Sequence, residues 1–119
     1  MSGFEEFVVV ILDSIAHGPF FDEQLLYEHT GFEKFSFEQM IYNIKKGTIT
    51  FTSSNLKNCD LTLFEMVTKS LALLVKFPYD HDNELLSATG CSKQKLHDVL
   101  NQIWGKDVTI EEYYEILNQ

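Results

Sequence analysis

Apolar residues recur at helical spacing over most of the chain. In four segments they lie three or four positions apart, and this spacing gathers them into one apolar stripe on a helix. The stripes consist of Phe4, Phe7, Val8, Ile11, Leu12 and Ile15; of Phe37, Met40, Ile41 and Ile44; of Leu96, Val99, Leu100, Ile103 and Trp104; and of Ile110, Tyr113, Tyr114 and Leu117. A fifth segment, 61–77, is apolar on most sides, which is typical of a central buried helix. The pattern predicts a core that contains Ile11, Ile44, Phe64, Val67, Leu71, Leu74, Leu100 and Ile103.

Polar residues and glycines mark the ends of these segments. Four capping boxes, in which two side chains satisfy free backbone donors reciprocally, begin at Ser2, Ser36, Thr62 and Thr109. Further candidates for the N-cap position are Asp22, Asp82 and Ser92. A glycine, which closes a helix easily in the left-handed conformation, follows five segments, at Gly18, Gly31, Gly47, Gly90 and Gly105. Together these signals predict helices over 3–17, 22–30, 36–46, 61–77, 82–89, 92–104 and 109–118.

The predicted fold class is all-α, in a single domain over 1–119. Only Thr48 to Ser53 alternates β-branched residues, which predicts one minor strand, a short hairpin or an extended connector. The order of helices, a Thr-Gly pair and a closing glycine recur at a spacing of about 60 residues, as in a repeat. We therefore expect two tandem three-helix units of helix-turn-helix type, over 3–47 and 63–105, followed by a C-terminal helix.

The charge balance bears on the kind of partner. Eighteen Asp and Glu residues face nine basic residues, all of them Lys, and the formal net charge is -9. Because affinity for nucleic acids depends on cationic side chains that displace counterions, this balance opposes nucleic-acid binding. Either the acidity serves solubility alone, or an acidic surface meets a basic protein.

The chain carries no recognisable motif of a catalytic or metal site. Cys59 and Cys91 belong to no C-x-x-C motif, and no Gly-x-Ser-x-Gly turn or phosphate-binding glycine loop is present. The run from Asp80 to Asp82 contains three residues of metal-ligating types, but adjacent residues rarely converge on one ion, and a helix cap explains them equally well. We therefore predict a protein with no enzymatic activity, no metal and no cofactor.

The longest apolar stretch and the N-terminus bear on localisation. The stretch from Leu71 to Val75 is too short to span a bilayer. The N-terminus is acidic where a signal peptide is basic, so we predict a cytoplasmic protein that does not associate with membranes.

The segment from Leu85 to Leu100 resembles a helix-turn-helix motif, with a short helix, a glycine turn and a Ser-capped second helix. The resemblance implies that the second helix presents polar residues to a DNA groove, namely Lys93, Gln94, His97, Asn101 and Gln102. Units of this kind also serve as protein-contact modules. A transcriptional regulator or adaptor is therefore the second hypothesis.

In size, acidity and lack of catalytic motifs, the chain resembles the small immunity proteins that bacteria make against their own toxins, including those of contact-dependent inhibition systems. The resemblance implies an inhibitor that covers the basic cleft of a nuclease-type toxin domain. Two acidic clusters with neighbouring tyrosines are the candidate contacts: Tyr79, Asp80, Asp82 and Glu84, and then Glu111, Glu112, Tyr113 and Glu115. Four aromatic residues flank turns, where they either fill gaps between helices or form an apolar anchor for a partner: Phe20, Phe21, Phe32 and Phe35. A third hypothesis is an acidic mimic of nucleic acid.

Overall fold

Helices account for most of the chain in the computed structural model, which describes residues 2–18, 22–76, 82–105, 107, 109, 111, 112 and 115. They are α1 (Gly3–His17), α2 (Glu23–Thr30), α3 (Lys34–Lys46), α4 (Leu56–Cys59), α5 (Leu61–Lys76), α6 (Asp82–Thr89) and α7 (Lys93–Trp104). Glu111, Glu112 and Glu115 are also helical, and no described residue belongs to a strand. The all-α fold class is confirmed.

Most of the predicted caps stabilise helix N-termini. The Ser2 hydroxyl accepts a hydrogen bond from the Glu5 amide, and the Glu5 carboxylate accepts one from the Ser2 amide, so this capping box is complete. The side chains of Asp22, Ser92 and Thr109 each accept the amide three residues further on. These oxygens satisfy N–H groups that the first helical turn leaves without a partner.

Two of the predicted capping boxes are wrong. Ser36 lies inside α3, which begins two residues earlier at Lys34. Thr62 lies inside α5, because the carboxylate of Asp60 accepts the amide of Leu63 at 2.9 Å and caps that helix instead. In both places the Ser or Thr of the motif lies within the first turn of the helix rather than at the N-cap position.

Four of the five closing glycines have the predicted left-handed conformation, namely Gly31, Gly47, Gly90 and Gly105. Gly18 is the exception, since it ends α1 with an extended backbone. The Gly47 amide donates to the carbonyls of Asn43 and Ile44, which closes the last turn of α3.

Gly47→Ala should lower the free energy of unfolding by about 1 kcal/mol. The reason is backbone strain alone, because φ is +85° and an added Cβ would meet no atom within 4 Å. Gly3→Ala is the matched control, since Gly3 also has open space but no positive φ. Urea denaturation of both variants checks this expectation, and equal losses would contradict it.

The segment 48–55 connects α3 to α4 without forming the predicted strand. No described strand lies beside it, and its polar backbone groups bond elsewhere. The Phe51 amide donates to the Glu5 carboxylate, and the Cys59 thiol donates to the Thr50 carbonyl. The Phe51 ring is buried and meets the edge of Phe4 at a centroid distance of 5.7 Å. The strand prediction is corrected to a connector of bends and turns, and the short helix α4 was not predicted.

Glu5→Gln should make the stability less dependent on acidic pH. The pKa of Glu5 lies below its ordinary value of 4.5, above all because the Ser2 amide donates a hydrogen bond to the carboxylate. The Ser2 hydroxyl and the Phe51 amide lower this pKa further, although burial acts in the opposite direction. A carboxyl with a lowered folded pKa contributes stability above its unfolded pKa, and this contribution is lost as the pH falls through the folded pKa. Between neutral pH and pH values below 4.5, the parent should therefore lose more unfolding free energy than Glu5→Gln. Urea titrations over this range test the expectation, with Glu6→Gln, an exposed carboxylate of the same turn, as control.

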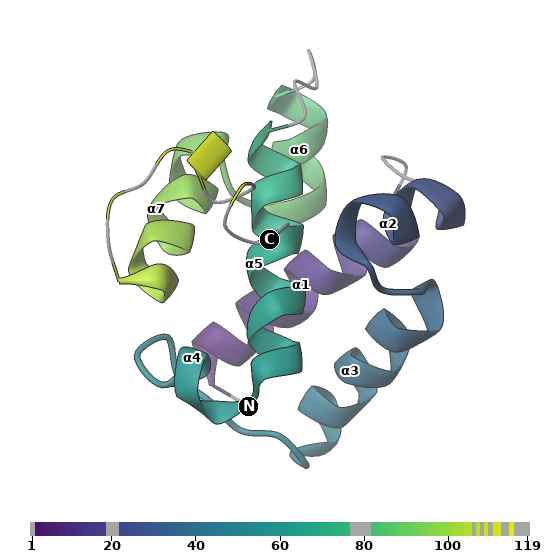
Figure 1. Cartoon of the computed structure of the whole chain (residues 1–119), viewed down its shortest axis with the longest axis vertical. Coiled ribbons are helices and arrows are strands. Elements are labelled where there is room, and N and C mark those ends of the chain that lie inside the picture. Colours follow the sequence, from purple (N-terminus) through teal and green to yellow (C-terminus); the bar gives the residue numbers. More distant parts are fainter. Residues whose placement is uncertain are drawn as a thin grey trace.

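Helix α5 lies at the centre of the molecule. Figure 1 shows it upright, with α1 crossing it, α2 and α3 on one side and α7 on the other, and it contacts α1, α2, α4 and α7. All eight residues predicted for the core are buried. The buried hydroxyls of Thr68 and Ser70 donate to carbonyls four residues earlier in α5, so they enter the core with their donors satisfied.

The turn between α2 and α3 has the same hydrogen bonds as the turn between α6 and α7. The Thr30 hydroxyl donates to the carbonyl four residues earlier at 2.6 Å and accepts the amide two residues later at 3.1 Å. Thr89 makes the same two bonds, at 2.8 and 3.1 Å. The same number of residues separates Thr30 from Thr89 and Lys34 from Lys93, at the starts of α3 and α7. The internal repeat over 3–47 and 63–105 stays a prediction, as does the single domain.

Candidate functional site

The first predicted acidic cluster lies largely outside the described residues. Tyr79 and Asp80 both lie outside them. Asp82 and Glu84 belong to the first turn of α6, but their side chains are outside the described part of the structure. This cluster stays a prediction.

The second predicted cluster lies on a short helical segment after α7. Glu111, Glu112 and Glu115 are helical and exposed, whereas Tyr113 lies outside the described residues. Glu112 lines a hollow of about 330 Å³ together with residues from α7 and from the intervening loop, namely His97, Asn101, Asp107 and Thr109. The segment therefore runs beside α7, and its carboxylates are accessible to a partner.

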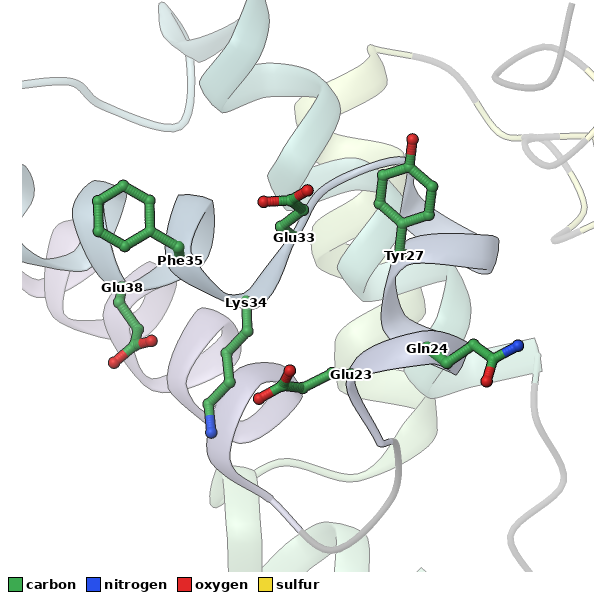
Figure 2. Close-up of a pocket in the computed structure, with 7 residues that line it drawn as sticks. All are labelled: Glu23, Gln24, Tyr27, Glu33, Lys34, Phe35 and Glu38. Atoms are coloured by element: carbon green, nitrogen blue, oxygen red, sulfur yellow. The ribbon is translucent and has the colours of Figure 1, made fainter.

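A larger groove, of about 560 Å³, lies between α2 and α3 (Figure 2). Its walls come from one face of α2, from the loop residue before α3 and from the first two turns of α3: Glu23, Gln24, Tyr27, Glu33, Lys34, Phe35 and Glu38. A second hollow of about 310 Å³ shares Glu23 and Lys34 with it and extends toward the end of α1. The two hollows adjoin at Glu23 and Lys34, and we call the first and larger of the two the α2–α3 groove.

The turn between the two helices fixes the shape of the groove. The Lys69 ammonium, from α5, donates to the Thr30 carbonyl at 3.3 Å and lies 5.9 Å above the Phe32 ring. Phe32 also meets the buried ring of Phe37 edge-on. A cation at the C-terminal end of α2 complements the helix dipole, and the two ring contacts hold the loop against the core. The walls of the groove are therefore anchored to the central helix.

Two aromatic side chains project from the walls of the groove into solvent. Tyr27 is 55% exposed and Phe35 is 69% exposed. Figure 2 shows the Tyr27 ring on α2 and the Phe35 ring on α3, with Glu33 on the loop between them. Within the described part of the chain, neither ring takes part in an aromatic contact or a hydrogen bond. Large aromatic side chains exposed in this way are typical of the residues that dominate protein interfaces.

The rim of the groove is acidic. Glu23, Glu33 and Glu38 carry three carboxylates, against the single ammonium of Lys34. The Glu38 carboxylate also lies 3.9 Å from the Nε2 atom of His17 at the end of α1. Among the described residues, no group of three or more His, Cys, Asp or Glu side chains is arranged to hold a metal ion. The groove is therefore suited to attract and hold a cationic group.

Most of this site was not predicted from the sequence. Phe35 was one of four aromatic residues proposed as gap fillers or anchors, but Tyr27, Glu23, Glu33 and Glu38 were not predicted as a group. A partial signal exists in the chain, since Glu23 and Tyr27 are four residues apart and share one face of α2. Their meeting with α3 depends on the angle at the turn, which no local pattern encodes.

Comparison of the chain with protein-family models, with curated proteins and with solved structures gave no match. In the described part of the chain, every helix is too short or too polar to cross a membrane.

Proposed function

We propose that this chain is a non-enzymatic protein-binding domain that inhibits a basic protein, in the manner of the small acidic immunity proteins that neutralise bacterial toxins. The observation that carries the proposal is the pair of exposed aromatic residues, Tyr27 and Phe35, on an acidic groove. A surface of this composition matches a cationic protein patch in both charge and apolar contact. In this proposal the protein acts in the cytoplasm, where Cys59 and Cys91 stay reduced.

The chemistry of the groove favours a protein partner over a nucleic acid. Three carboxylates repel a phosphate backbone, and the whole chain has a net charge of -9 and no Arg. The same charges attract a toxin domain whose substrate cleft is basic. Burial of Tyr27 and Phe35 would then provide contact area that excludes water from the carboxylate–cation pairs. Inhibition follows because the inhibitor covers the cleft that the toxin uses for its own substrate.

The two acidic clusters predicted from the sequence have a supporting part in the proposal. Glu111, Glu112 and Glu115 are exposed on an element that packs beside α7, at a distance in sequence from the groove. Carboxylates outside the direct contact raise the rate of encounter with a basic partner through their long-range field. We assign that role to this cluster and to Asp80, Asp82 and Glu84.

Tyr27→Ala with Phe35→Ala should abolish capture of the partner from a lysate of the native cell. Hot-spot aromatics contribute about 2 kcal/mol or more each, so the double variant should bind at least about a hundredfold more weakly. Leu61→Ala is the matched control, because Leu61 is an equally exposed apolar side chain on α5. Mass spectrometry of the co-purifying proteins should identify a basic protein with the parent and with Leu61→Ala only. An acidic partner, or a basic one retained by the double variant, would refute the proposal.

The second candidate function is a helix-turn-helix regulator or adaptor. The short helix α6, the left-handed Gly90 and the Ser92-capped α7 have the order of elements that this motif requires. The exposed Asp98 lies one turn from Gln94 and accepts its amide, so the face that would meet DNA also carries a negative charge. Salt-dependent binding of random-sequence duplex DNA would favour this candidate. Weak affinity for the DNA would favour its adaptor form. An acidic mimic of nucleic acid is the third candidate.

A further inference from the structure

We infer that the segment of the partner which occupies the α2–α3 groove is a basic amphipathic helix lying along the exposed face of α3. The inference rests on the proposed function and specifies the element that binds. The molecule has two matching helix faces, one on α7 beside the described residues that follow it and the other on α3.

The open face runs along α3 from the groove. Phe35, Glu38 and Tyr42 follow one another at helical spacing, and Tyr42 is 56% exposed. The Lys46 ammonium lies 5.5 Å above the Tyr42 ring, at the far end of this row. Figure 2 shows Phe35 and Glu38 on the α3 wall of the groove. The row thus offers two aromatic rings with a carboxylate between them, over about two helical turns.

The matching face of α7 carries His97 and Asn101. These residues are separated from Glu38 and Tyr42 by the same interval that separates Thr30 from Thr89 in the two equivalent turns. The residues buried under the two faces match as well, with Phe37, Met40, Ile41 and Ile44 in α3 and Leu96, Val99, Leu100 and Ile103 in α7. The two helices therefore present equivalent faces to their surroundings.

Described residues after α7 lie beside this α7 face. Asp107, Thr109 and Glu112 line one hollow together with His97 and Asn101, and the backbone at Glu112 is helical. No described segment after α7 lines the hollows beside α3. By analogy with α7, the outer face of α3 is suited to a helical segment supplied by a partner.

The charge of the groove selects a basic helix. A second copy of this chain would bring Glu111, Glu112 and Glu115 of its own C-terminal segment toward Glu23, Glu33 and Glu38, and like charges at short range are unfavourable. A helix with Lys or Arg beside apolar residues would instead place cations among these carboxylates and apolar side chains against Tyr27 and Phe35. Helix-in-groove recognition of this type uses anchors at positions i, i+3 or i+4, and i+7.

The test uses three labelled synthetic peptides of about 18 residues, long enough for five helical turns. The first is an amphipathic Leu/Lys helix. The second is the same sequence with two central Pro substitutions, and the third is the Leu/Glu counterpart of the first. Fluorescence anisotropy should show that the Leu/Lys helix binds at least about tenfold more tightly than the Pro peptide, because Pro breaks the helix. Circular dichroism should show that the bound Leu/Lys peptide gains helicity.

Variants locate the binding and separate the possible failures. Tyr27→Ala with Phe35→Ala should weaken binding of the Leu/Lys helix at least tenfold, and Leu61→Ala should leave it unchanged. If the Pro peptide binds as tightly as the Leu/Lys helix, and the double variant loses this binding, the helix inference is overturned. The proposal of a basic partner then still stands. Binding of the Leu/Glu peptide would overturn the charge argument, and with it the proposed function. Binding that the double variant retains would overturn the placement in the groove.

Discussion

Leu71→Ala should lower the free energy of unfolding by about 2–5 kcal/mol, the range for removing a large side chain from a packed core. Leu71 is completely buried in α5, the helix that contacts α1, α2, α4 and α7. The substitution removes transfer free energy and leaves a cavity that neighbours held by several helices cannot readily fill. A loss near the upper end of the range would indicate that these helices do not relax toward one another.

Urea denaturation followed by far-UV circular dichroism measures this effect. Leu61→Ala makes the same chemical change on the same helix at a side chain that is 68% exposed, and it should cost no more than about 0.5 kcal/mol. A single cooperative transition in the parent would agree with the predicted single domain. A Leu71→Ala variant as stable as the parent would contradict the central position of α5.

The fold was predictable because its signals are local. Stripes of apolar residues, caps such as Ser2 and Ser92, and glycines such as Gly31 and Gly105 act within a few residues of the helix they shape. Their errors are local too. Ser36 fits the pattern of a cap, but the helix already begins at Lys34, and the pattern itself carries no information on which turn is first.

The connector 48–55 shows where local reasoning ends. Its alternation of β-branched residues is typical of a strand, yet a strand needs a neighbouring strand to satisfy its backbone. The amide of Phe51 instead donates to the carboxylate of Glu5, in the first turn of α1. A residue that serves its own helix as part of a capping box thus also holds a distant loop, and only the tertiary structure reveals the second role.

The groove was missed for the same reason. Tyr27 and Phe35 are eight positions apart in sequence and belong to different helices, so no periodic pattern relates them. Their relative placement depends on the turn that Lys69 holds from the central helix. The composition predicts a basic protein as the partner, and this stays a prediction. The contacts predicted from the sequence are runs of neighbouring carboxylates, whereas the carboxylates of the groove come from three separate segments.

Reversal of the groove charges should slow association with the basic partner by about 10- to 1,000-fold at low ionic strength, the range over which electrostatic steering changes association rates. The variant combines Glu23→Lys, Glu33→Lys and Glu38→Lys, all at exposed positions, so the fold should persist with a far-UV spectrum like that of the parent. Added salt should slow association of the parent, because it screens the attraction. The reversed variant should show little of this dependence, or the opposite one.

The matched control reverses the second predicted cluster through Glu111→Lys, Glu112→Lys and Glu115→Lys. Both triple variants change the net charge of the chain by the same amount, so any difference between them reports where the charges lie.

If the groove is the contact, its reversal should slow association and speed dissociation, because cations then face cations at close range. Reversal of the C-terminal cluster should slow association more weakly and leave dissociation unchanged, as expected for charges that act only through the long-range field. Stopped-flow or surface-based kinetics over a series of salt concentrations separate the two rates. Equal effects of the two variants would indicate that the acidic residues act only by steering the partner at long range. An effect on dissociation from the C-terminal variant alone would move the contact from the α2–α3 groove to the end of the chain.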